Sequence, residues 1–362
     1  MSKRELLSSN QLYHSNGGIT NRAWCVRWNH KGGVLASCGD DKNIKLWKLT
    51  EGAPPYVKYS STLSGSHSRT IRSVAFSPSD QMLASCGFDA AIVLYELIDN
   101  EYTEVGKLEG HENEVKCCAF SPSGEFLASC SRDKSVWFWQ LDEDEDFQVA
   151  SILQPHTQDV KFVVWHPNEE LLVSCSYDCS IKFFKYDGDD WITQQKIDSA
   201  HGSTVWSADF SADGESLVTV GGDSVIKHFE AADFVIEKLL LTFDNLSPDC
   251  QIWEREKRNM PITSSHWHCV CSYKADTRWP LYTVSWNHFN NIIAVGGGDQ
   301  NLRLLRVEEG AGDGQMRTLV EYGAKRKFAS EINSLAWNPH DANLLALAED
   351  TGQIHIVNLV DM

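Results

Sequence analysis

The chain has 362 residues and a formal net charge of -18. This charge would repel nucleic acid and anionic membrane surfaces, so we expect protein partners, no nucleic acid and no membrane. Hydrophobic residues make up 42% of the chain, and 13 Trp and 24 Gly favour a turn-rich β protein. The start "MSKRELLSSNQLYH" lacks the apolar core of a signal peptide. We therefore expect a cytoplasmic protein that can also be nuclear.

In chain order, one sequence unit recurs: an apolar strand ending in Trp or Phe, a turn, an "LAS"-like strand, Asp and a third strand. The seven copies begin at Ala23, Thr70, Gly110, Asp159, Thr204, Pro280 and Glu331. The repeated aspartates are Asp41, Asp89, Asp133, Asp178, Asp223 and Asp299, at intervals of 48, 44, 45, 45 and 76 residues. In the seventh copy Thr351 takes this position. The period predicts an all-β fold, a seven-bladed WD40 β-propeller.

We expect residues 1–362 to form a single propeller domain. Fourth strands are predicted at "EYTEVGKL", "DFQVASIL", "DWITQQKI", "SHWHCVCSY" and "QMRTLVEY". The seventh copy runs almost to Met362, so the N-terminal "ELLSSNQLY" is expected to supply its fourth strand and close the ring. The interval of 76 residues predicts an inserted loop at about 230–265, between blades five and six.

Four histidines each precede a repeated aspartate by 22 residues: His67 and Asp89, His111 and Asp133, His156 and Asp178, His201 and Asp223. A metal or catalytic site needs such groups to converge on one point, whereas a constant spacing places each pair in its own blade. In WD40 propellers the His, a Ser or Thr, the Asp and an aromatic residue form a structural hydrogen-bonded tetrad. His111, Ser129, Asp133 and Trp139 match it.

The cysteines also follow the repeat, with Cys38, Cys86, Cys130 and Cys175 at one position in successive copies. Zinc or cluster ligands need clustered pairs, so we interpret these as buried thiols and expect no metal. Cys269 and Cys271 should share one strand face and pack against the core. Because no nucleophile, phosphate-loop or zinc-protease motif is present, we expect no enzyme and no cofactor.

The copies differ at two positions that in WD40 propellers project onto the top face around the channel. We single out eight basic or aromatic residues at these positions: Arg72, Lys116, Arg132 and Lys161, with Phe88, Tyr177, Trp24 and Trp206. Such residues suit a carboxylate next to an aromatic group, as in an acidic peptide or a chain's C-terminus. Arginine and aromatic residues also anchor protein interfaces. The basic residues span blades two to four and form our predicted recognition face.

Segments such as "GHENEVK", "SRDKSVW" and "HTQDVKFVVWHP" closely resemble the WD40 subunit of the cytosolic iron-sulfur protein assembly machinery. The match is strongest over residues 108–208. The resemblance implies a non-enzymatic scaffold of a targeting complex that delivers [4Fe-4S] clusters to cytosolic and nuclear apoproteins. It implies a MIP18-type adaptor, a HEAT-repeat protein, an iron-only-hydrogenase-like cluster carrier and client apoproteins as partners. It also implies a functional surface role for Arg132.

The chain departs from the pattern in its last two copies, where Leu305 and Val357 replace the third-strand aromatic. The insertion after Phe229 is a second departure. Both departures weaken any assignment of partners to blades five to seven. The fold alone also permits a WD40 substrate receptor or a chromatin-associated scaffold, which stays the alternative.

Overall fold

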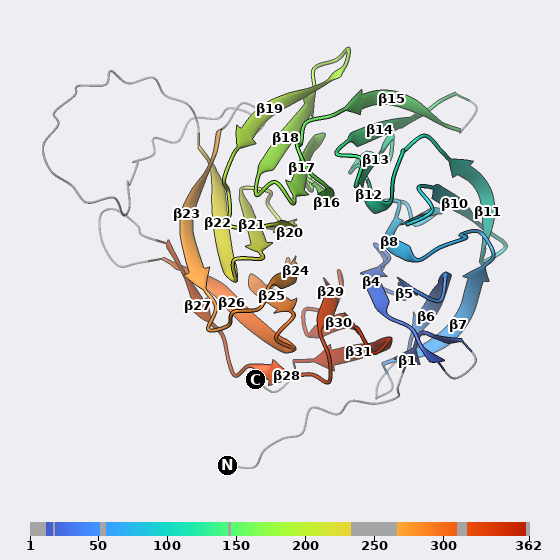
Figure 1. Cartoon of the computed structure of the whole chain (residues 1–362). Coiled ribbons are helices and arrows are strands. Elements are labelled where there is room, and N and C mark those ends of the chain that lie inside the picture. Colours follow the sequence, from blue (N-terminus) through green and yellow to red (C-terminus); the bar gives the residue numbers. More distant parts are fainter. Residues whose placement is uncertain are drawn as a thin grey trace, which may run out of the picture.

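Seven antiparallel sheets stand around a central channel in the structure, a computed structural model that describes residues 12–16, 19–50, 56–143, 146–232, 266–309 and 317–359. Figure 1 looks along this channel, with the first strand of each blade innermost. The protein is therefore a seven-bladed β-propeller, as the repeat predicts. Within the described ranges no helix is long and apolar enough to cross a membrane.

The innermost strands are β4 (Ala23–Trp28), β8 (Ile71–Phe76), β12 (Val115–Phe120), β16 (Val160–Trp165), β20 (Val205–Phe210), β24 (Leu281–Trp286) and β29 (Ile332–Trp337). The second strands are β5 (Val34–Gly39), β9 (Met82–Gly87), β13 (Phe126–Ser131), β17 (Leu171–Ser176), β21 (Ser216–Gly221), β25 (Ile292–Gly297) and β30 (Leu344–Glu349). The third strands are β6 (Asn43–Leu49), β10 (Ile92–Ile98), β14 (Val136–Leu141), β18 (Ile181–Tyr186), β22 (Val225–Ala232), β26 (Asn301–Glu309) and β31 (Gln353–Asn358). The outermost strands are β7 (Val57–Ser64), β11 (Glu101–Leu108), β15 (Phe147–Leu153), β19 (Trp191–Ile197), β23 (His266–Lys274) and β27 (Arg317–Glu321), with β1 (Leu12–Tyr13) in blade seven.

The hydrophobic core lies between neighbouring blades. The second strands are buried on both faces because each sheet packs against a blade on either side. Between blades three and four, the Phe138 and Trp191 rings stack with centroids 4.1 Å apart, and Trp165 meets Trp191 edge-on at 5.3 Å. Stacked and edge-on rings fill such a space densely, so each blade depends on its neighbours for burial.

The N-terminal segment joins blade seven. Leu12 and Tyr13 pair antiparallel with Ile354 and Gln353 of β31, which makes β1 the outermost strand of that sheet. The rest of the predicted closing segment, residues 5–11, lies outside the described residues. A short hairpin of β2 (Ser15–Asn16) and β3 (Ile19–Thr20) then leads into blade one.

The insertion lies inside blade five, not between blades five and six as the sequence analysis predicts. Strand β22 continues to Ala232, and Glu230, Ala231 and Ala232 pair with His268, Trp267 and His266 of β23. The long connection therefore joins the third and fourth strands of one sheet, and its residues 233–265 lie outside the described ranges. The predicted boundary at 230 falls within a strand because the hydrophobic pattern weakens before the pairing ends.

Candidate functional site on the top face

We define the top face as the face at which the innermost strands begin. Each blade has one residue there that is left out of the strand pairing. Every innermost strand has a register shift at its second residue, so that this residue has no direct partner on the second strand. A bulge of this kind bends the strand and re-aims a side chain. The seven residues, called the top-face ring below, are Trp24, Arg72, Lys116, Lys161, Trp206, Tyr282 and Asn333.

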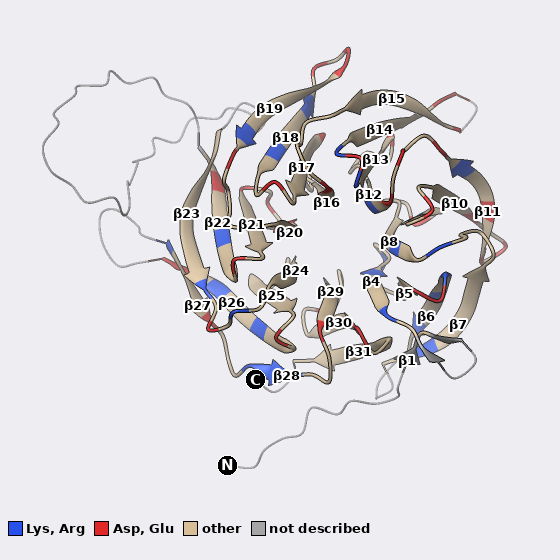
Figure 2. Ribbon diagram, viewed as in Figure 1, with Lys and Arg blue, Asp and Glu red and all other residues tan. Residues whose placement is uncertain are grey.

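The ring surrounds the mouth of the central channel. Six of its members line one pocket there, with Lys161 just outside it. Figure 2 places Lys and Arg on β4, β8 and β12, the inner strands of blades one to three. The opposite side of the mouth is aromatic, because the Trp206 and Tyr282 rings meet edge-on at 5.3 Å. The sequence-predicted basic and aromatic residues are thus brought together from different blades.

Ring cations and aromatic rings contact one another directly. The Arg72 guanidinium lies 4.9 Å from the centroid of the Trp24 ring, and Lys116 Nζ lies 4.2 Å from that of Phe88. Lys161 Nζ lies between two rings, 5.2 Å from the Tyr177 centroid and 5.3 Å from the Trp206 centroid. Cations are attracted to the faces of aromatic rings, so these contacts bring positive charge and aromatic surface together, the two features that suit a carboxylate beside an aromatic group.

A groove between blades three and four adjoins the ring and contains Arg132 and Tyr177. Both side chains are about half exposed, at 54%. The groove also contains Glu114, whose carboxylate accepts hydrogen bonds from Lys116 at 2.6 Å and Arg69 at 3.1 Å and lies 3.8 Å from Arg132. Glu114 is not among the residues predicted from the sequence, because that prediction covers only basic and aromatic residues.

The charges of this region are coupled. Burial lowers the pKa of the Lys116 ammonium, the hydrogen bond to Glu114 opposes that effect, and Lys161 and Arg72 lower the pKa further. Burial alone would raise the pKa of Glu114, but its hydrogen bonds with Lys116 and Arg69 lower it. Lys161 donates to Asp159 at 3.0 Å. The groove is therefore a set of ion pairs that a bound acidic group must join or rearrange.

The predicted tetrads are present below this face. In blade three His111 bonds to Ser129 and Asp133, each at 2.8 Å, and Trp139 Nε1 donates to Ser129 at 2.9 Å. Burial alone would raise the pKa of Asp133, but its hydrogen bonds with His111 and Ser135 lower it to about 2. His67, His156 and His201 bond in the same way to Asp89, Asp178 and Asp223. These histidines hold the turn of their own blade and do not converge.

Blade one has a tetrad that the sequence analysis misses. His14 bonds to Asp41 at 2.9 Å and to Ser37 at 2.8 Å, and Trp47 donates to Ser37 at 2.9 Å. The His-to-Asp separation is 27 residues here because the β2–β3 hairpin lies between His14 and the first strand. A search that allows a few extra residues before "AWCVRW" would find it.

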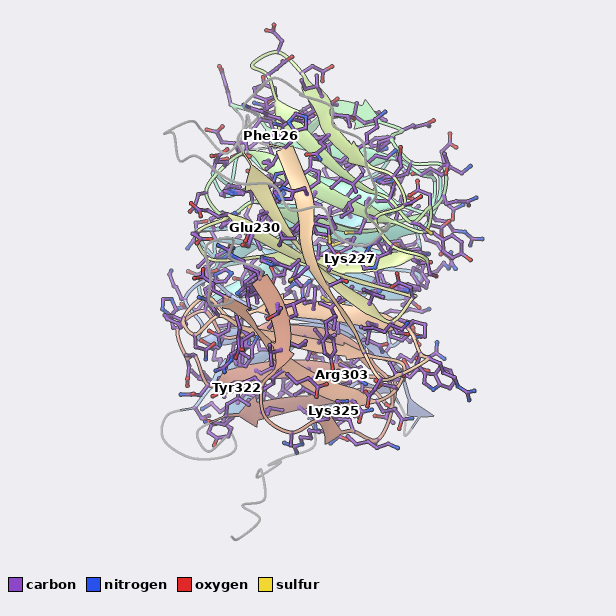
Figure 3. All side chains as sticks on the ribbon, turned by 90° about the vertical axis from the view of Figure 1, so that its left-hand side faces the viewer. Phe126, Lys227, Glu230, Arg303, Tyr322 and Lys325 are labelled. Atoms are coloured by element: carbon purple, nitrogen blue, oxygen red, sulfur yellow. The ribbon has the colours of Figure 1, made fainter. Side chains whose placement is uncertain are left out.

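Blades six and seven hold their turns with other residues. The buried Arg303 guanidinium bonds to Asp299 with both terminal nitrogens, and it contacts Asp276 at 3.4 Å. Figure 3 shows Arg303 beside Lys325, which also pairs with Asp276. In blade seven, the buried Glu349 faces His355 at 3.3 Å. The two blades that lack the third-strand aromatic residue thus also lack the tetrad and have other polar contacts in its place.

The described cysteines are free thiols. No three His, Cys, Asp or Glu of the described ranges come together as a group that could hold a metal ion. Burial raises the pKa of Cys86, Cys130 and Cys175. The prediction for Cys269 and Cys271 is wrong. A register shift between their partners Phe229 and His228 breaks the alternation, so Cys269 is exposed and Cys271 is partly buried.

Comparisons with known proteins agree with this architecture. The family profile described as WD domain, G-beta repeat matches residues 10–48, 58–96, 102–140, 147–185 and 193–230. Each matched segment runs from the outermost strand of one blade through the third strand of the next. The first segment includes β1. Blade six and strands β29 to β31 of blade seven, where Arg303 and His355 depart from the tetrad, lie outside the matched segments.

A Caenorhabditis elegans protein described as a probable cytosolic iron-sulfur protein assembly protein, CIAO1 homolog, is 47% identical over 358 residues, 96% of this chain and 98% of that protein. The chain belongs to this family of WD40-repeat proteins. Shorter matches include a Schistosoma japonicum protein of the same description, 47% identical over 37% of this chain and 38% of its own. Protein CIA1 of Arabidopsis thaliana is 35% identical over 26% of this chain and 28% of its own.

Proposed function

We propose that this protein acts in cytosolic iron-sulfur protein assembly as a non-enzymatic docking platform. The observation that carries the proposal is the match of 47% identity along 96% of the chain to a relative described as a cytosolic iron-sulfur protein assembly protein. The channel mouth supports binding over chemistry, because its cations and aromatic rings are arranged for contact with an anion and an apolar group. The protein works in the cytoplasm and also serves nuclear clients.

The partners follow from the family resemblance. They are a MIP18-type adaptor, a HEAT-repeat adaptor protein, an iron-only-hydrogenase-like cluster carrier and client apoproteins. The platform holds adaptor and client on one rigid body, which raises their effective concentration and needs no catalytic group. In this role the clusters pass to the clients as cargo and this chain does not hold them.

The recognition face comprises the top-face ring together with Arg132, Tyr177 and Phe88. An acidic peptide or a chain's C-terminus places its carboxylate among Lys116, Arg132 and Lys161. Its aromatic group then packs on the Trp206 and Tyr177 side, where Lys161 already lies over both rings. Charge-assisted hydrogen bonds and ring contacts together supply specificity for this pair of groups.

A pull-down from cytosol tests the proposal. Wild-type protein and Arg132→Glu serve as bait, mass spectrometry identifies the captured proteins, and circular dichroism verifies equal folding. We expect the adaptor and the HEAT-repeat protein with both baits and client apoproteins with the wild type alone. Absence of the adaptor from both samples would contradict the proposal, and capture of ubiquitin-ligase or chromatin subunits in its place would support the alternative scaffold function.

A further inference from the structure

The pocket at the channel mouth has an unbalanced charge. Three cationic side chains line it, Arg27, Arg72 and Lys116, whereas no Asp or Glu among the described residues does so. Hydroxyl groups of Ser207, Thr283 and other inner-strand residues complete the polar lining. This charge is unexpected in a chain with a net charge of -18. A narrow cleft lined by one sign of charge concentrates counter-ions of the other sign.

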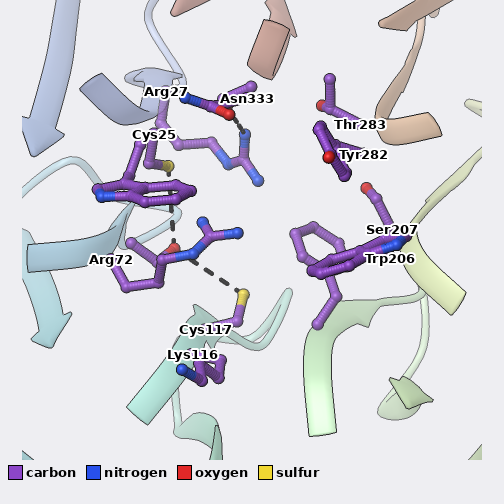
Figure 4. A pocket seen from close by; sticks show the side chains of 14 residues that line it. Cys25, Arg27, Arg72, Lys116, Cys117, Trp206, Ser207, Tyr282, Thr283 and Asn333 are labelled. Atoms are coloured by element: carbon purple, nitrogen blue, oxygen red, sulfur yellow. Dashed lines mark hydrogen bonds between the residues drawn. The ribbon is translucent and has the colours of Figure 1, made fainter. Parts of the chain in front are cut away.

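The two arginines extend into the central space from neighbouring strands, β4 and β8, as Figure 4 shows. Arg27 Nη1 donates to the Val26 carbonyl at 3.0 Å and to Ser334 Oγ at 3.4 Å. The Arg72 guanidinium lies over the Trp24 ring. Among the described residues neither arginine has a carboxylate within ion-pair distance, so their charge is balanced only by neutral groups.

Among the carboxyl groups, Asp209 has an electrostatic effect on the Arg27 guanidinium. Its oxygens already accept backbone hydrogen bonds from Phe210 at 3.0 Å and Trp286 at 2.7 Å, and it does not line the pocket. Burial raises the pKa of Asp209, and the charges of His288 and Arg27 oppose that effect. Arg27 and Arg72 therefore remain able to bind an anion.

The groove between blades three and four differs in this respect. There Glu114 contacts Arg69, Lys116 and Arg132, and Asp159 pairs with Lys161. The cations of the groove already have carboxylate partners within the chain. Of the three cations at the channel mouth, Lys116 pairs with Glu114, whereas Arg27 and Arg72 have no such partner among the described residues.

The pocket is also small. The free space between its side chains is about 20 Å³, room for one or two water-sized groups. Such a space admits a halide ion or a single carboxylate head, and the rest of a larger ligand would lie outside it. The size and the charge together define the ligand class.

We propose that the channel mouth binds one small, singly charged anion between Arg27 and Arg72, at a site distinct from the groove around Arg132. Arg27 and Arg72 donate hydrogen bonds to the anion, and the inner-strand hydroxyls complete its surroundings. The anion is either a free ion from solution or the carboxylate of a bound protein. This inference goes beyond the proposed docking function, since it requires no partner and holds for any use of the propeller.

Chloride binding to the purified full-length chain tests the site. The ³⁵Cl NMR signal broadens when chloride exchanges with a protein site, and added formate should remove the excess line width by competing for the arginine pair. Arg72→Gln and Arg27→Gln should each weaken chloride binding about tenfold, the value of one charge-assisted hydrogen bond. Arg132→Gln should leave the excess line width nearly unchanged, because that cation belongs to the groove.

The decisive comparison is between Arg72→Gln and Arg132→Gln, with circular dichroism to verify the fold of each variant. Arg72 is half-buried and rests on Trp24, so its substitution preserves the core even where Arg27→Gln destabilises the chain. Equal loss of line width in both variants would overturn the proposal, because it would indicate general attraction to a basic surface. An unchanged line width in Arg72→Gln would also overturn it. Displacement of chloride by purified adaptor would identify a partner carboxylate as the occupant, and chloride binding that persists beside the adaptor would identify a free ion.

Discussion

Blades three and six hold the same turn by different means. In blade three the His111 imidazole lies between Asp133 and Ser129. It forms one hydrogen bond with the Asp133 carboxylate and one with the Ser129 hydroxyl. In blade six the donor is Arg303, fully charged and 1% exposed, and Asp299 keeps the position of the repeated aspartate. These two blades share the aspartate, while its donor comes from another part of the blade and carries another charge.

Removal of Arg303 should have the largest effect. Arg303→Met leaves Asp299 without its charged partner in a buried site, and we expect a loss of about 3–5 kcal/mol in the free energy of unfolding. Urea denaturation measures it. Arg306→Gln, on the same strand but 51% exposed, should cost under about 1 kcal/mol. Equal costs for the two variants would mean that the Arg303 pair does not secure blade six.

Removal of His111 should cost less. His111→Ala removes the hydrogen bonds of the imidazole to the Asp133 carboxylate and the Ser129 hydroxyl, although Ser135 and Trp139 still donate to these groups. The loss should be about 2–3 kcal/mol. His14→Ala in blade one should give a similar value, since its contacts to Asp41 and Ser37 have the same lengths within 0.1 Å. A cost near zero for His14→Ala would show that blade one does not depend on its N-terminal histidine.

Acid should weaken blades two, three and five through their aspartates. Hydrogen bonds with His67, His111 and His201 outweigh burial and hold the pKa values of Asp89, Asp133 and Asp223 at about 2. Because these folded-state pKa values lie below the unfolded value of 3.8, the stabilisation is complete above about pH 5 and is lost as the pH falls through 3.8 towards 2. Each group contributes up to about 2 kcal/mol. Urea titrations between pH 5 and pH 2 should show a shallower decline for Asp133→Asn than for wild type; parallel declines would contradict this assignment.

Loss of a single hydrogen bond gives the smallest expected effect. Trp139→Phe removes the bond from the indole to Ser129 and should cost about 1–2 kcal/mol, including the lost ring area. The tetrad of blade four already has Phe184 at the equivalent position and tolerates its absence. Unfolding by urea measures the change, and a cost as large as that of His111→Ala would show that the indole, not the imidazole, secures the turn.

The architecture is largely predictable from the sequence because each blade repeats one local pattern. The period locates the seven innermost strands, and the spacing of 22 residues identifies four of the tetrads. His14 is not predicted because a hairpin lengthens its distance in sequence from Asp41. Arg303 is not predicted because an arginine takes the place of the histidine as the partner of Asp299. The insertion is assigned to the wrong side of β23 because strand pairing, which is a property of the sheet, extends beyond the visible repeat.

The site is only partly predictable. The ring residues follow from the repeat, since each takes the same place in its strand. Glu114 and Arg27 do not follow, because their roles depend on which side chains from different blades meet at the channel and in the groove. Sequence position gives the direction of a side chain, whereas its charge partners are set by packing between blades.

The central claim is that the basic part of the top face captures protein partners. The most direct test compares Arg132→Glu/Lys161→Glu with a control of equal charge change, Lys48→Glu/Lys58→Glu, whose lysines are exposed on the outer strands of blade one. Both proteins are used to capture client apoproteins from cytosol in the presence of the adaptor. The account predicts loss of clients with the top-face variant and full capture with the control. Equal capture by the two variants, with folding intact, would contradict it.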